Sequence, residues 1–159
     1  MFDQNSIDNY VVLFAIIYNI LIIAVFILRA KEKYSLEEMI GPLFDLLLIP
    51  FSVLLILNSV NHSDSGRIGT LIPMITYLLY DIWYRQLTKQ KPRHHPEKMP
   101  KELVLYIILF YFAGMAITGY AFIVSRFSGY IILVIFMSSI VAYFFYQINY
   151  KKHFKKFKY

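Results

Sequence analysis

Residues 10–28 of the chain read YVVLFAIIYNILIIAVFIL, an apolar run that is interrupted only by Asn19. The hydrocarbon core of a bilayer is about 30 Å thick, and a helix needs roughly 20 apolar residues to cross it. Hydrocarbon offers no water to the peptide groups, so a crossing segment has to satisfy them internally, as a helix does. The run therefore predicts a transmembrane helix.

The composition of the whole chain agrees with this reading. Of its 159 residues, 58% are apolar and only 16% are charged, and the mean hydropathy is +0.54. Soluble domains are about 45–50% apolar and about 25% charged. With 6 glycines, 6 prolines and no cysteine, the chain does not resemble a disordered, collagen-like or disulfide-stabilised protein. It is predicted to be an integral membrane protein with a single domain, residues 1–159.

Four further apolar runs follow the first one. The five predicted spans cover residues 10–28, 39–57, 68–84, 103–124 and 130–148. The strands of a membrane barrel would alternate apolar and polar residues, whereas these runs are continuously apolar. The predicted fold class is therefore all-α: a polytopic bundle of five transmembrane helices.

The distribution of basic residues predicts the orientation of the chain. The loops after the first and third spans and the C-terminal tail carry fourteen of the sixteen lysines and arginines, and only Arg67 and Arg126 lie on the other side. Cytoplasmic loops are the ones enriched in Lys and Arg. We therefore expect the N-terminus outside and the C-terminus in the cytoplasm, with the protein in the cell membrane, taken to be a prokaryotic inner membrane.

The tail, residues 149–159, is both basic and aromatic. Its aromatic residues recur at helical spacing, which predicts an amphipathic extension of the fifth helix against anionic headgroups at the cytoplasmic face. The expected headgroup contacts are Lys151, Lys152, Lys155 and Lys156. Nucleic-acid binding is not expected, because membrane topology already accounts for the basic residues.

Two local patterns predict how individual helices begin and pack. Ser35 and Glu38 have the spacing of a capping box, which predicts that the second helix begins near Leu36. Small residues let helices approach closely in lipid. We therefore expect the fourth and fifth helices to pack as a hairpin through Gly114, Thr118 and Ala121 on one side and Ser138 and Ala142 on the other.

Asp45 is the residue whose position in the predicted membrane region most needs an explanation. It lies about 13 Å along the second helix from Leu36, and a carboxylate at that depth costs several kcal/mol unless it is paired, protonated or hydrated. Glu38, Asp45, Ser52 and Ser59 are spaced by seven and form one polar stripe. We expect this stripe to face protein or water.

The third span offers partners for Asp45. Tyr77, Tyr80 and Asp81 lie on it, and Asn19 of the first span is a further candidate. Together with Asp45 and Ser52, these residues are the predicted substrate- or ion-binding site between the second and third helices. The plain structural alternative for Asp81 is an ion pair with Arg85, four residues later.

No metal site and no cofactor are predicted. His94 and His95, with Glu97 and Glu102 nearby, lie in a proline-flanked basic loop without cysteine or a histidine four residues away, a pattern typical of a solvated loop rather than of zinc ligands. Catalytic motifs of the nucleophile-elbow, zincin and P-loop types are absent from the sequence.

Three classes of function remain open at this point. The first is non-catalytic: an accessory subunit of a larger membrane complex, or an oligomeric carrier of a small molecule or ion. The second is an intramembrane enzyme that uses Asp45 and Asp81 on a lipid or peptide. The third is a small membrane protein of the holin or immunity type. The expected partners are membrane lipids and either further copies of the chain or other membrane subunits.

Overall fold

The computed structural model describes residues 3–87 and 101–156. All regular structure in these two ranges is helical. The helices are α1 (Gln4–Ala30), α2 (Tyr34–Val60), α3 (Ser65–Ile82), α4 (Lys101–Val124) and α5 (Arg126–Lys156), and a π-helical turn, η1 (Trp83–Leu87), continues α3. The all-helical prediction is confirmed.

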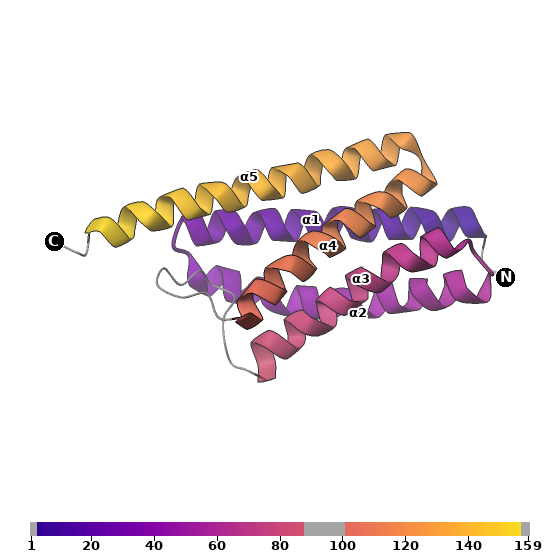
Figure 1. Cartoon of the computed structure of the whole chain (residues 1–159), viewed down its shortest axis with the longest axis horizontal. Helices are drawn as coiled ribbons and strands as arrows, with labels where there is room; N and C mark the ends of the chain where they lie inside the picture. Colours follow the sequence, from indigo (N-terminus) through magenta and orange to yellow (C-terminus); the bar gives the residue numbers. More distant parts are fainter. Residues whose placement is uncertain (1–2, 88–100, 157–159) are drawn as a thin grey trace.

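The helices form an elongated bundle in which α1 lies between α5 and α2 (Figure 1). α1 packs against α5, α2 and α4, while α3 lies against α4 and α2. Successive helices run in opposite directions. The bundle has an end that contains the α2–α3 and α4–α5 turns, called here the Arg67 end, and an end that contains the α1–α2 turn and η1, called the Arg85 end.

Four of the helices in the described ranges are long and apolar enough to cross a membrane: α1, α2, α4 and the Arg126–Asn149 part of α5. α3 is not among them: its 18 residues include Arg67, Pro73 and Asp81, which lower its mean hydropathy below that of a crossing segment. Many large apolar side chains are exposed on the outside of the bundle, including Ile20, Leu46, Ile108 and Val134. Helices that are apolar on their outer faces as well as toward the core are those expected of a membrane-spanning protein.

The buried face of α2 lies beside the predicted polar stripe rather than on it. Four buried residues of α2 follow one another at intervals of seven positions: Glu37, Phe44, Phe51 and Asn58. Each lies one position before a member of the predicted polar stripe, and one position is a rotation of about 100° around the helix. Glu38 and Ser59 are exposed, and Asp45 and Ser52 are only half-buried. The stripe that was expected to face protein or water therefore lies at the edge of the buried face, where Asp45 pairs with Arg85.

The predicted capping box is wrong. α2 begins at Tyr34 with Lys33 as N-cap and without a side-chain cap, so Ser35 already lies in the first turn. The turn before it depends on Glu32, whose φ of 57° is in the left-handed region. A side-chain cap does occur at α3, where the carboxylate of Asp64 accepts a hydrogen bond of 2.9 Å from the backbone N–H of Arg67.

The α4–α5 hairpin forms as predicted, but through a different face of α5. Gly114, Thr118 and Ala121 are buried on α4, whereas Ser138 is exposed. Instead, the ring of Phe136 lies on Gly114, so closely that a Cβ there would be 2.2 Å from a ring carbon. The close approach of the two helices here depends on an aromatic ring of α5 packed on a glycine of α4, and not on small residues of both helices.

The predicted extension of the fifth helix is present, since α5 continues through Lys156. The side chains of Lys151, Lys152, Lys155 and Lys156 lie outside the part of the chain that the structure describes, as do His94, His95 and Glu97.

Candidate functional site

Arg85 is the centre of a polar cluster at the Arg85 end, which joins α2 to α3 and η1. Nη2 of Arg85 lies 2.5 Å from Oδ1 of Asp45 and 2.6 Å from Oδ2 of Asp81. Nε of Arg85 donates a second hydrogen bond of 3.0 Å to the same oxygen of Asp81, and Nε2 of Gln86 donates one of 3.2 Å to Oδ2 of Asp45. One guanidinium therefore serves two carboxylates.

Two features of the chain bring Arg85 to this place. Arg85 follows Asp81 by four residues, which puts the two side chains on the same face of a helix. The guanidinium then crosses α2 at Gly41, where a Cβ atom would lie 2.9 Å from Nη1 of Arg85. The absence of a side chain at Gly41 thus leaves the space through which Arg85 reaches Asp45.

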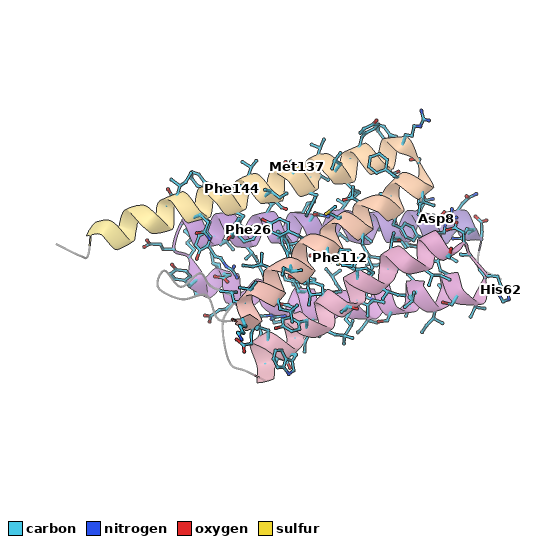
Figure 2. All side chains as sticks on the ribbon, viewed as in Figure 1. Asp8, Phe26, His62, Phe112, Met137 and Phe144 are labelled. Atoms are coloured by element: carbon cyan, nitrogen blue, oxygen red, sulfur yellow. The ribbon has the colours of Figure 1, made fainter. Side chains whose placement is uncertain are left out.

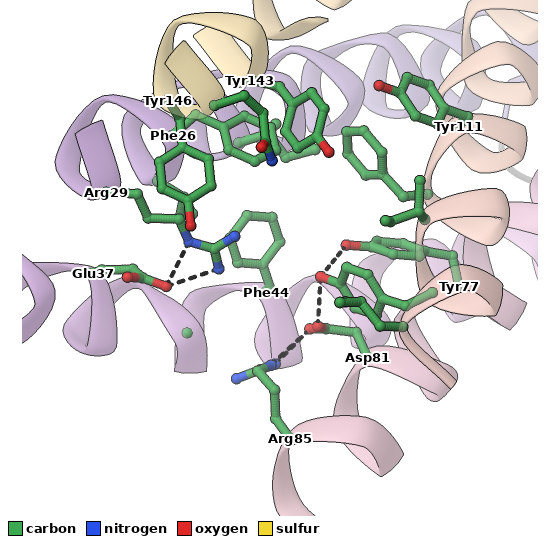
Figure 3. A pocket seen from close by; sticks show the side chains of 18 of the residues that line it. Phe26, Arg29, Glu37, Phe44, Tyr77, Asp81, Arg85, Tyr111, Tyr143 and Tyr146 are labelled. Atoms are coloured by element: carbon green, nitrogen blue, oxygen red, sulfur yellow. Dashed lines mark hydrogen bonds and ion pairs between the residues drawn. The ribbon is translucent and has the colours of Figure 1, made fainter. Parts of the chain in front are cut away.

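Two tyrosines complete the hydrogen bonding of Asp81. The hydroxyl of Tyr106 donates a hydrogen bond of 3.0 Å to Oδ1 of Asp81, and the hydroxyls of Tyr106 and Tyr77 are 2.9 Å apart. Figure 3 shows the resulting chain from Arg85 through Asp81 to Tyr77. Asp81 is only 3% exposed. Its carboxylate is bonded on both oxygens, as a buried charge has to be.

A second ion pair lies nearby, where α1 ends and α2 begins. Nε and Nη2 of Arg29 both lie 2.8 Å from Oε1 of Glu37, and the guanidinium is 5.8 Å from the centre of the Phe26 ring. Both charged side chains are only 10% exposed. This pair fixes the α1–α2 corner and neutralises its own charge.

A cavity of about 380 Å³ opens between these two charged groups, with walls from α1 to α5. Its polar rim includes Arg29, Glu37, Glu38, Asp81 and Arg85. The rest of the wall is mostly apolar, apart from Gln147 and the tyrosine hydroxyls, and Figure 3 shows rings surrounding the space. The aromatic residues in this wall are Phe26, Phe44, Tyr77, Tyr106, Phe110, Tyr111, Tyr143 and Tyr146. Its size and lining are those of a small-molecule site, with mostly apolar walls and a few polar groups.

The structure brings together some of the predicted site residues and separates others. Asp45 and Asp81 meet through Arg85, and Tyr77 joins them through Tyr106. Tyr80 instead donates to the backbone carbonyl of Glu102.

Asn19 and Ser52 lie away from this group. Asn19 is fully buried and donates to the carbonyl of Ala15 in its own helix. Neither Asn19 nor Ser52 is among the residues that line the cavity. The predicted contact between Asn19 and Asp45 is therefore absent from the described hydrogen bonds.

Sequence reasoning missed a second polar cluster, at the Arg67 end. Asp8 is 4% exposed, and its carboxylate accepts hydrogen bonds of 3.1 and 2.9 Å from Arg67 and one of 2.8 Å from the hydroxyl of Tyr120. Asn58 donates to the same hydroxyl at 3.3 Å. Figure 2 shows Asp8 at the same end of the bundle as His62 in the α2–α3 turn. This cluster joins α1, α2, α3 and α4.

The Arg67 cluster is a closed network rather than a binding site. Gln4 adds hydrogen bonds to both Asp8 and Asn58 and accepts one from Ser63, so the polar groups satisfy one another. The sequence signal that would have found it is the pair of opposite charges, Asp8 and Arg67, that flank predicted spans on the side poor in basic residues.

Within the described ranges, no group of three or more histidine, cysteine, aspartate or glutamate residues is placed to hold a metal ion. Comparison of the chain with protein-family models, with curated proteins and with solved structures gives no match. The function has therefore to be argued from the residues of the cavity and of the two charged groups beside it.

Proposed function

We propose that this chain is a small non-catalytic integral membrane protein that binds a small molecule at the Arg85 end, as a carrier or as a subunit of a membrane complex. The observation that carries the proposal is the cavity itself. It combines about 380 Å³ of space with apolar walls and a rim on which charged groups are already held in place.

The proposal includes five membrane crossings, with the N-terminus outside and the C-terminus in the cytoplasm. α3 supports the fifth crossing, since α2 ends at the Arg67 end and α4 begins at the Arg85 end. A crossing α3 brings Arg67 and Asp81 into the bundle, and both are paired there. The basic loops would then lie on the cytoplasmic side, as the positive-inside rule requires.

The amphipathic tail fits the same orientation. α5 has 31 residues, or about 46 Å at helical rise, which exceeds the thickness of a hydrocarbon core of about 30 Å. The last turns of α5 would leave the bilayer on the cytoplasmic side, where its lysines could bind anionic lipid headgroups.

The alternative of an intramembrane enzyme has less support from the geometry. General acid–base chemistry needs a carboxyl group that can exchange a proton with a bound substrate. Asp45 and Asp81 are instead bonded to the same guanidinium, and Asp81 also accepts from Tyr106. The arrangement is that of a structural counter-ion, so the cavity beside it is better suited to binding than to catalysis.

The test is to fill the cavity. Ile107 lines it, whereas its neighbour Ile108 is 57% exposed on the outside of the same helix. The wild-type protein, Ile107→Trp and Ile108→Trp would be purified in lipid nanodiscs, and molecules retained by the protein would be identified by native mass spectrometry. We expect a retained small molecule in the wild type and in Ile108→Trp but not in Ile107→Trp. Equal retention by both tryptophan variants would contradict the proposal.

A further inference from the structure

We propose that the cavity at the Arg85 end takes a lipophilic organic cation: an ammonium group, quaternary or protonated tertiary, on an aromatic or branched apolar body. This inference rests on the proposed function and names the class of its ligand. Three observations support it: the excess negative charge of the rim, the number of aromatic rings in the wall, and the engagement of both arginines.

The rim has more carboxylates than guanidinium groups. Asp81 and Arg85 line the cavity, and Asp45, which is not among the lining residues, is bonded to the same guanidinium, so that this trio has one negative charge in excess. The second pair, Arg29 and Glu37, is balanced within itself, and Glu38 adds a further carboxylate to the lining. An excess negative charge in surroundings of low dielectric constant is stabilised by a counter-ion that enters the same space. A positively charged ligand would supply it.

The wall offers further stabilisation to a cation. Phe26 and Tyr143 have ring centres 5.3 Å apart in an edge-to-face arrangement. Phe110 meets Phe26 at 6.3 Å and Tyr77 at 5.9 Å in the same manner. These linked rings all line the cavity. Aromatic faces attract an ammonium group through their quadrupole, and they are a usual means of recognising quaternary ammonium ligands.

An anionic ligand, such as a lipid phosphate, is disfavoured by the same contacts. It would need a guanidinium, but Arg29 is bonded to Glu37 through two nitrogens and Arg85 is bonded to two carboxylates. Binding an anion would therefore leave buried carboxylates without their partners. An inorganic cation or a proton would satisfy the charge but would leave the apolar wall without contacts.

The proposal is tested with three probes of similar size and different charge. They are benzyltrimethylammonium, its neutral isostere neopentylbenzene, and the anion phenylmethanesulfonate. Equilibrium dialysis against the full chain in nanodiscs, with empty nanodiscs subtracted, would give the three affinities. We expect saturable binding of the cation, on the order of tenfold tighter than the neutral probe, and no saturable binding of the anion. Preference for the anion or the neutral probe would overturn the inference.

Two variants locate the effect. Asp45→Asn keeps the size of the side chain and removes the excess negative charge of the trio beside the cavity, so it is expected to weaken binding of the cation on the order of tenfold without changing binding of the neutral probe. Asp64→Asn makes the same charge change at the exposed Arg67 end and is expected to change neither. If Asp45→Asn does not fold, Tyr143→Leu removes a ring from the wall and should weaken the cation more than the neutral probe.

Failure of this inference differs from failure of the proposed function. A cavity that binds the neutral probe as tightly as the cation, and loses both in Ile107→Trp, refutes the ligand class alone. Binding of all probes that survives in Ile107→Trp would show that the cavity is not the site, and both proposals would be wrong.

Discussion

Asp45 on α2 and Asp81 on α3 are bonded to the same nitrogen atom, Nη2 of Arg85, at 2.5 and 2.6 Å. The two helices are therefore joined by one guanidinium group, and loss of that group would leave both carboxylates without it. The half-buried Asp45 and the fully buried Asp81 would face each other as two negative charges if that guanidinium were removed.

Arg85→Gln is accordingly expected to lower the free energy of unfolding by about 3 kcal/mol, because loss of one partner leaves buried charge uncompensated. Arg85→Lys should cost less, since it keeps the charge but not the planar, multi-donor geometry. Denaturant unfolding in detergent measures both. Arg126→Gln, a charge change at an exposed residue of α5, is the matched control. Equal stability of Arg85→Gln and Arg126→Gln would refute the role of the bridge.

Gly114→Ala tests the contact between α4 and α5. The added Cβ would lie 2.2 to 2.8 Å from three atoms of the Phe136 ring, so we expect a loss of about 1–3 kcal/mol from overpacking. The double variant with Phe136→Leu should recover part of that loss. Gly69→Ala is the control, because nothing lies within 4 Å of a Cβ at Gly69 and alanine favours a helix. Thermal unfolding of the three variants would decide the matter.

Asp8→Ala tests the Arg67 cluster. It removes the acceptor for Arg67 and Tyr120 and should lower the free energy of unfolding by about 3 kcal/mol, the usual result of breaking a buried ion pair on one side. Asp3→Ala makes the same change at an exposed residue before the same helix, and it should have little effect. A Tm of Asp8→Ala equal to that of Asp3→Ala would show that the network contributes nothing.

Acid is expected to lower the stability of the start of α3, because it protonates the carboxylate of Asp64. The backbone N–H and the guanidinium of Arg67 hold the pKa of Asp64 below its ordinary value of 3.8. A carboxyl group with a lowered pKa in the folded state contributes stability above the unfolded value, and that contribution is lost as the pH falls through the folded value. Asp64→Asn, which can still cap the helix, should therefore lose less stability below about pH 4 than the wild type, as measured by unfolding across pH.

The orientation is tested by labelling single cysteines in intact cells. Cysteines at Ser63 and Ser128 are expected to react with a membrane-impermeant reagent from outside, because Ser63 lies in the α2–α3 turn and Ser128 in the first turn of α5, both at the Arg67 end. Cysteines at Lys91 and Lys155 should react only after the membrane is permeabilised. Reaction of the Lys91 position from outside would refute both the five crossings and the assignment of the Arg85 end to the cytoplasm.

The sequence predicted the helices well because their signal, an unbroken apolar run, is local. It did not show which face of α2 is buried, since residues spaced by seven define parallel stripes without saying which one faces the core. The polar stripe through Asp45 was preferred for its cost in lipid, but the buried stripe passes through Phe44 and Phe51. Asp45 can lie at the edge of the bundle because Arg85, from another helix, reaches it there.

The sites were predicted in part for the same reason. The pairing of Asp81 with Arg85 is confirmed because both belong to one helical turn. The partnership of Asp8 with Arg67 joins residues 59 positions apart in the sequence, and no periodicity indicates which distant charges will meet. The space over Gly41 that admits Arg85 is likewise a property of packing rather than of local sequence.

The packing of α1 against α5 has a consequence for the order in which the protein is assembled. α1 emerges first during synthesis, and its neighbour α5 emerges last, on the order of 10 s later at ordinary translation speed. Of the helices that α1 packs against, α2 is the first to follow it, and the ion pair between Arg29 and Glu37, eight residues apart, can close as soon as the first turn is made. The α1–α2 hairpin would thus be the first stable intermediate, and the aromatic cavity would come into existence only when the last helix arrives to close it.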